Sequence, residues 1–213
     1  MYTYIKRLID IFLSFLGIVV LAIPMLIIAV VIKLDSPGNV FFKQKRIGRN
    51  KTEFYILKFR SMSAQTPHDM PTHQLSGANS YITKVGAFLR KYSLDELPQM
   101  FNIFVGDMSI IGPRPALWNQ YDLIEERDKY GANNIRPGLT GLAQISGRDE
   151  LPIDVKARLD GEYVKKESFV FDVKMFFGTV LSVLRHDGVV EGGTGAMRNQ
   201  EKMNKQKMHE VTK

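Results

Sequence analysis

Residues 11–32 read IFLSFLGIVVLAIPMLIIAVVI, and this stretch decides how the chain is organised. It carries no charged side chain over 22 residues, which is long enough to cross a bilayer core of about 30 Å. Lys6 and Arg7 precede it, as in the charged region of a signal peptide. The apolar run is too long for a signal peptide, however, and no small-residue cleavage site follows it. The sequence therefore predicts a membrane helix.

Basic residues flank this apolar run on both sides. Lys6 and Arg7 lie before it, while Lys33 and a cluster at residues 43–49 lie after it. The positive-inside rule places both ends in the cytoplasm. Pro24 removes one helical hydrogen bond and bends the axis, so a re-entrant helix–break–helix could enter and leave by the same face. These rules alone leave a single-pass helix with a tolerated proline open as the alternative.

Composition limits what the rest of the chain can be. With 213 residues, one domain with a core is expected, and the net charge of +7 favours nucleic acid, anionic lipid or a phosphorylated substrate as partner. The absence of cysteine excludes disulfides and thiolate metal sites. We expect a re-entrant membrane segment at residues 1–34, a cytosolic catalytic domain at 35–190 and a flexible basic tail at 191–213.

The predicted fold class is α-rich α+β, with a compact cytosolic domain. Two apolar runs, 40–42 and 54–57, on either side of a basic turn predict a small β-hairpin. Apolar residues between 81 and 104 predict amphipathic helical pieces that pack on the core or lie in the lipid headgroup layer. Further helices are expected at 118–130, 153–166 and 169–184, and a lid-like or binding loop at 62–80.

Asp95 and Glu96 are adjacent carboxylates in an apolar stretch, and such a pair can bind a divalent cation. Ser93-x-x-Glu96 is also a capping box with Asp95 in the first turn, so a helix N-terminus explains the same residues. Pro98 lies where that helix would first need a backbone N–H, so the helix must be kinked or begin later. The local pattern leaves both interpretations open.

Several arginines lie beside prolines or glycines, or shortly before the paired acids. They are Arg90, Arg114, Arg136 and Arg148. Guanidinium groups bind phosphate bidentately, and rigid flanks lower the entropy lost on binding. Each one alone is better explained as an exposed cation at a turn, but together with the acids and the membrane segment they indicate phosphate handling. No P-loop, Rossmann glycine pattern or zinc-type histidine spacing occurs in the sequence.

Six motifs in order cover the chain from residue 6 to about residue 184. They are KRLID at 6–10, KFRSM at 58–62, SLDELPQ at 93–99, GDMSIIGPRP at 106–115, RPGLTG at 136–141 and QISGR at 144–148. With these motifs the chain resembles the bacterial sugar transferases, the small monotopic phosphoglycosyl transferases.

This resemblance implies a re-entrant helix, a site on the cytoplasmic face of the bacterial inner membrane, and Mg²⁺. It implies that Asp95 attacks the β-phosphorus of a UDP-sugar, releases UMP and forms a sugar-phosphoryl aspartate, from which polyprenyl (undecaprenyl) phosphate takes the phospho-sugar. Asp95 and Glu96 are the expected catalytic residues and metal ligands. The expected phosphate or substrate ligands are Lys58, Arg60, Arg90, Arg114, Arg136, Arg148 and Asp172.

The chain departs from the family at the membrane break, where Ile23-Pro24 replaces the frequent Ser-Pro, so proline alone must make the bend. Larger relatives carry extra membrane spans ahead of this module, and the expected organisation here is the minimal catalytic form. The expected partners are a UDP-sugar, polyprenyl phosphate and membrane lipids, without nucleic acid, and a homodimer is a possible assembly.

Three alternatives of other kinds compete with this reaction. A nucleic-acid binder accounts only for the charge, and the apolar run of 22 residues is hard to place in it. A basic membrane scaffold accounts for the charge but gives no reason for the setting of Asp95 and Glu96. A nucleotide-sugar hydrolase would use water as acceptor, which exclusion of water at a membrane disfavours.

Overall fold

The computed structural model describes residues 2–63, 65–66, 81–147 and 151–185. Most of the loop predicted at 62–80, the tail predicted at 191–213, and Arg148 lie outside the described residues.

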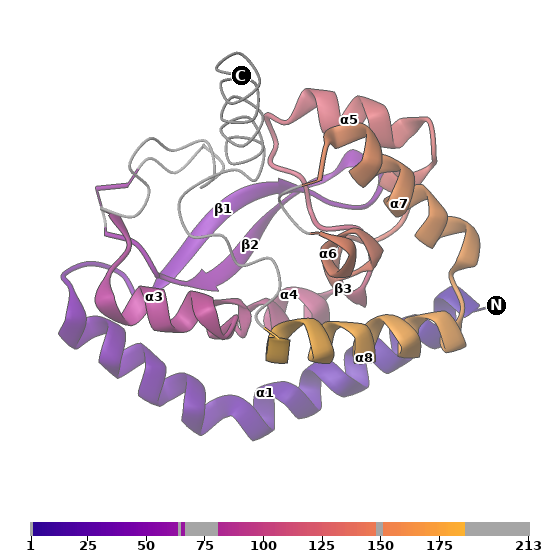
Figure 1. Ribbon diagram of the computed structural model, residues 1–213. Helices are drawn as coiled ribbons and strands as arrows, with labels where there is room; N and C mark the ends of the chain where they lie inside the picture. Colours follow the sequence, from indigo (N-terminus) through magenta and orange to yellow (C-terminus); the bar gives the residue numbers. More distant parts are fainter. Residues whose placement is uncertain (1, 64, 67–80, 148–150, 186–213) are drawn as a thin grey trace, which may run out of the picture.

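Helix α1, Tyr2–Asp35, is the longest element, and it confirms the predicted apolar helix. Its 34 residues correspond to about 51 Å at 1.5 Å per residue. The predicted break is instead a bend, because helical structure continues through Pro24 without interruption. A proline inside a helix tilts the axis by its clash with the preceding turn, and Figure 1 shows α1 bowed along one side of the domain.

The first half of helix α1 turns polar side chains toward the domain, and most apolar side chains of the helix face outward. Lys6, Asp10 and Ser14 are spaced by four residues, so they share one helical face, and all three are buried. On the outside, Phe12 is 65% exposed and Ile23 is 71% exposed. A contiguous apolar surface of this kind marks an interaction face, and by length and composition α1 could cross a membrane.

The predicted β-hairpin is confirmed. Strands β1, Phe41–Ile47, and β2, Glu53–Phe59, pair antiparallel and are joined by the short helix η1, Arg49–Lys51. Phe54 and Ile56 of β2 pack with Ile103 and Met108 in one core cluster. The hairpin therefore rests on the segment that follows the paired acids.

The helical pieces predicted between 81 and 104 are α3, Lys84–Lys91, the short helix η3, Leu94–Glu96, and α4, Gln99–Val105. Three further predicted helices are present as α5, Tyr121–Asp128, α7, Ile153–Lys166, and α8, Phe169–Arg185. The helix η4, Ala132–Asn134, and the helix α6, Leu142–Ser146, were not predicted.

A second, parallel strand pair was also not predicted. Strand β3, Ser109–Ile111, pairs with β4, Gly138–Thr140. The backbone of β4 approaches the backbone just after β3 so closely that a Cβ on Gly138 would lie 2.1 Å from the backbone nitrogen of Gly112. Glycine at both places lets the segment that carries Arg114 cross the segment that carries Arg136.

Side chains fasten α1 to the domain at both ends. Near its start, Arg7 donates from Nη1 to the carbonyl oxygen of Ile103 (2.6 Å) and from Nη2 to that of Phe104 (2.8 Å), which caps α4. At the end of α1, Arg60, the residue after β2, donates to the carbonyl oxygens of Ser36 (2.7 Å) and Pro37. The helix is thus one wall of the domain.

Candidate active site

The paired carboxylates lie in η3, and the backbone there excludes the capping box. Ser93 adopts a left-handed conformation (φ 56°, ψ 22°) and its side chain caps no helix. Helix α4 begins only at Gln99, after Pro98, which confirms the later start. The capping interpretation of Ser93 and Glu96 is therefore wrong, because the proline moves the helix start three residues beyond Glu96. A non-glycine residue with positive φ costs free energy, and such residues cluster at functional sites.

The Glu96 side chain is held by two cations. Lys58 Nζ lies 2.7 Å from Glu96 Oε1, and Arg114 Nη2 lies 3.2 Å from the same oxygen. Burial by itself would raise the pKa of Glu96, but Lys58 and Arg114 outweigh it and bring the pKa well below its ordinary value. Glu96 is therefore a fixed negative charge at neutral pH.

Asp95 has a different environment from its neighbour. It is only 8% exposed, and this burial raises its pKa above the ordinary value. The charge of Lys58 opposes this rise, that of Glu96 adds to it, and Arg90 and Arg114 oppose it more weakly. The result is a poorly solvated carboxylate among cations, which is an arrangement suited to attack on a phosphoryl group.

The structure gathers five of the predicted residues at this place: Lys58, Arg90, Asp95, Glu96 and Arg114. The other described ones lie elsewhere. The Arg60 guanidinium binds the carbonyls after α1. The Arg136 Nε donates to the carbonyl oxygen of Gly106 (2.9 Å), and Asp172 accepts from Tyr163 (2.7 Å), Tyr2 (2.6 Å) and Lys6.

Two residues that sequence reasoning did not single out support the site. Asn102 of α4 accepts the Leu57 N–H (2.9 Å) and donates to the Tyr55 carbonyl oxygen (2.9 Å), so it fixes the strand that carries Lys58. Gln99 is 2% exposed, and its Nε2 has no hydrogen-bond partner among the described residues. The SLDELPQ motif contains Gln99, but nothing in its pattern indicated an unpaired amide.

The donor set of this cluster fits Mg²⁺ shared with a substrate. No group of three or more His, Cys, Asp or Glu side chains able to hold a metal occurs among the described residues. Asp95 and Glu96 alone supply two carboxylates, and Mg²⁺ is commonly bound by one or two carboxylates together with substrate phosphates and water.

The sequence model of the family described as "Bacterial sugar transferase" matches residues 1–186. The chain belongs to this family. Its motifs therefore resemble those of bacterial sugar transferases because of common descent, and the resemblance expected from the sequence is confirmed.

Several bacterial sugar transferases are similar to the chain. It is 40% identical over 167 residues to the UDP-glucose:undecaprenyl-phosphate glucose-1-phosphate transferase of Xanthomonas campestris pv. campestris, covering 75% of this chain and 34% of that protein. It is 38% identical over 191 residues to the UDP-N-acetylgalactosamine-undecaprenyl-phosphate N-acetylgalactosaminephosphotransferase of Aeromonas hydrophila, covering 86% of this chain and 44% of that protein.

The match to a third bacterial sugar transferase covers nearly all of that protein. The chain is 39% identical over 192 residues to the exopolysaccharide production protein PSS of Rhizobium leguminosarum bv. phaseoli, covering 84% of this chain and 95% of that protein. The chain therefore spans less than half the length of the first two relatives and almost the whole of PSS.

Proposed function

We propose that the chain transfers a phospho-sugar from a UDP-sugar to undecaprenyl phosphate, releasing UMP and forming an undecaprenyl diphosphosugar. The observation that carries this proposal is the buried Asp95 carboxylate beside Glu96, which Lys58 and Arg114 hold in place. The names of two relatives, which act on a UDP-sugar and undecaprenyl phosphate, support the same reaction.

In the first step, an Asp95 carboxylate oxygen attacks the β-phosphorus of the UDP-sugar. The bond between that phosphorus and the oxygen bridging to the α-phosphorus breaks, and UMP leaves with the electron pair. The sugar phosphate is then joined to Asp95 as an acyl phosphate. Lys58, Arg90 and Arg114 surround the carboxylates and offset the negative charge that gathers on the reacting phosphates.

In the second step, an oxygen of undecaprenyl phosphate attacks the phosphorus of the acyl phosphate. The bond from phosphorus to Asp95 breaks, and the carboxylate is regenerated. Because Glu96 is pinned by its two cations, it remains charged and in place through both steps. Bound Mg²⁺, held by Asp95 and Glu96, would neutralise charge on the substrate diphosphate.

We further propose that α1 is a re-entrant helix in the cytoplasmic leaflet of the inner membrane. Its start contacts the domain through Arg7 and its end through Arg60, so both ends lie against one domain. A helix that crossed the bilayer would place its ends on opposite faces. Single cysteines at Thr3 and Lys45 test this: labelling of both from the cytoplasm is expected, and labelling of the two from opposite sides would refute it.

The reaction is tested with detergent-solubilised protein, a panel of UDP-sugars and undecaprenyl phosphate. We expect release of UMP with at least one sugar, and a phospho-sugar adduct on Asp95 when the acceptor is omitted. Asp95→Asn should lose both, whereas Asp154→Asn, the same change at an exposed carboxylate of α7, should keep them.

Each outcome separates the alternatives. An active Asp95→Asn enzyme would refute the covalent mechanism. Release of UMP without acceptor, at an undiminished rate, would identify a hydrolase. Inertness across the panel would favour the scaffold.

A further inference from the structure

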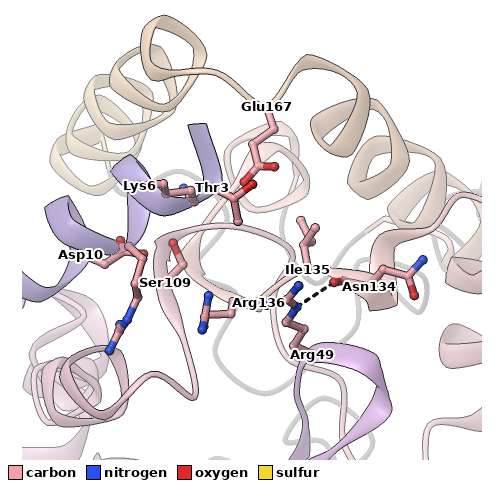
Figure 2. A pocket seen from close by; sticks show the side chains of 10 residues that line it. Thr3, Lys6, Asp10, Arg49, Ser109, Asn134, Ile135, Arg136 and Glu167 are labelled. Carbon is pink, nitrogen blue, oxygen red and sulfur yellow. Dashed lines mark hydrogen bonds between the residues drawn. The ribbon is translucent and has the colours of Figure 1, made fainter. Parts of the chain in front are cut away.

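A pocket lies at the start of α1, and none of the five residues gathered around Asp95 and Glu96 lines it. Figure 2 shows side chains from α1, η1, β3 and the segment before β4 converging on it. Its volume is about 110 Å³, and its wall includes four cations and two hydroxyl groups, from Lys6, Arg7, Arg49, Arg136, Thr3 and Ser109. In Figure 1 the start of α1 and the helix α3 lie at opposite sides of the molecule.

Two of these guanidinium groups, those of Arg49 and Arg136, use only their Nε atoms in hydrogen bonds among the described residues. Arg49 donates from Nε to the carbonyl oxygen of Asn134 (3.2 Å), and Arg136 donates from Nε to that of Gly106 (2.9 Å). Within the described part of the chain these are the hydrogen bonds that the two groups make, so their terminal NH₂ groups remain available. Terminal guanidinium nitrogens pair well with phosphate oxygens.

The cations of the pocket repel one another. Burial lowers the pKa of Arg136 most, and the positive charges of Arg7 and Arg49 lower it further. An anion placed between such groups relieves this repulsion, and clustered cations without a matching anion attract one.

The hydroxyl of Ser109 also indicates a ligand. Ser109 is 1% exposed, and its Oγ has no hydrogen-bond partner among the described residues. The hydroxyl lies beside the carboxylate of Asp10, where it works against the rise in pKa that burial gives that carboxyl. Buried hydroxyl groups are almost always paired, so an unpaired one in a cationic pocket is a donor for an anion.

Two carboxylates share this wall and do not cancel its charge. Asp10 accepts the backbone N–H of Ile110 (3.0 Å), so one of its oxygens is occupied in holding β3. Burial raises the pKa of Glu167, which makes its ionised form less favourable than that of an exposed glutamate. Lys6 is paired with Asp172, which leaves Arg7, Arg49 and Arg136 as the cations of the wall, and these outnumber Asp10 and Glu167.

Size and surroundings indicate the class of ligand. Pockets for drug-sized molecules measure about 300–1,000 Å³, so this one is too small for a nucleotide sugar and suits a single phosphate group. Exposed apolar side chains lie in the adjoining turns, with Tyr4 81%, Leu8 68% and Val170 77% exposed. We infer that the pocket is a second anion site, which binds one phosphate group of a membrane lipid or of a small soluble phosphate.

The test measures binding to the full chain in detergent, with no need for turnover. Inorganic phosphate forms one arm and short-chain dihexanoyl phosphatidylglycerol the other, each followed by ³¹P NMR in the presence of UMP. Arg49→Gln removes an exposed pocket cation, and Lys51→Gln removes a cation of the same short helix η1 that does not line the pocket. Thr3→Val removes a pocket hydroxyl at the exposed start of α1, as a second variant.

Loss of one charge-assisted contact should weaken binding about tenfold in Arg49→Gln, with a smaller loss in Thr3→Val and none in Lys51→Gln. Weakening in the phosphate arm identifies a soluble phosphate site, and weakening confined to the lipid arm identifies a lipid site. Equal binding by wild type and Arg49→Gln in both arms, or equal losses in Arg49→Gln and Lys51→Gln, would overturn the inference.

Discussion

Replacing Lys58 by methionine tests the electrostatic frame of the candidate active site. The side chains of Lys58 and Glu96 are 15% and 18% exposed, so their ion pair is largely shielded from water. Breaking a buried pair costs about 3–5 kcal/mol, and the low end applies here because Arg114 still contacts Glu96. A loss of about 3 kcal/mol lowers the melting temperature of a chain of this size by roughly 6–12 °C.

Lys51→Met is the matched control, since Lys51 pairs with Asp128 at 2.9 Å while both side chains are about half exposed. Exposed pairs contribute about 0–1 kcal/mol, so this variant should melt within about 4 °C of wild type. The assay is thermal unfolding of detergent-solubilised protein by circular dichroism. If the melting temperature falls by the same small amount in both variants, the ion pair of Lys58 does not stabilise the site as a buried pair would.

The pH dependence of the same experiment has a definite sign. The pKa of Glu96 is below its ordinary value in the folded protein, so its pairing stabilises the fold fully above the unfolded value of about 4.3. This contribution is lost as the pH falls through the lowered folded value. The difference in melting temperature between wild type and Lys58→Met should therefore be largest near pH 7 and narrow below about pH 4. A difference that stays constant down to pH 3 would contradict the assigned pairing.

Three further predictions follow from contacts elsewhere in the chain. Asp172→Asn removes the charge opposite Lys6, whose ion pair is 11% exposed on each side, and should cost about 3 kcal/mol in chemical unfolding. Gly86→Ala should reduce the yield of folded protein, because the new Cβ would lie 1.9 Å from the backbone oxygen of Ser61. Gly131→Ala is the control: its new Cβ would have no contact under 3.6 Å, but its φ is positive, so it reports the cost of backbone strain without a clash. Chelation with EDTA should abolish UMP release and added Mg²⁺ should restore it, whereas activity that persists in EDTA would exclude the metal.

Elements with strong periodicity were predictable from the sequence. Helix α7 occupies the predicted residues 153–166, and α8 ends one residue beyond its predicted bound. The parallel pair of β3 and β4 was not predictable, because strands of three residues carry too little pattern and their pairing depends on contacts distant in sequence. The backbone crossing at Gly112 and Gly138 is likewise visible only in three dimensions.

The candidate site was only partly predictable, because it too depends on contacts between segments distant in sequence. The motifs identified Asp95, Glu96 and the cations that could bind phosphate. No motif indicates which of these cations lie beside the two carboxylates. Arg114 reaches Glu96, whereas Arg136, which lies beside a proline in the same way, faces the pocket at the start of α1. Local spacing cannot separate the two, because the difference arises from where their loops cross.

The attachment of α1 at both ends has a practical consequence for protein production. Met25 and Ile32 of this helix form one core cluster with Phe59 and Leu89, so removing the helix to obtain a soluble fragment would uncover that cluster. It would also remove the Arg7 side chain that caps α4, and the Ile32 carbonyl oxygen to which Arg60 donates (3.3 Å). Exchanging the helix for a foreign anchor would have the same effect, so detergents or lipid particles that keep the whole chain intact are the better route to active material.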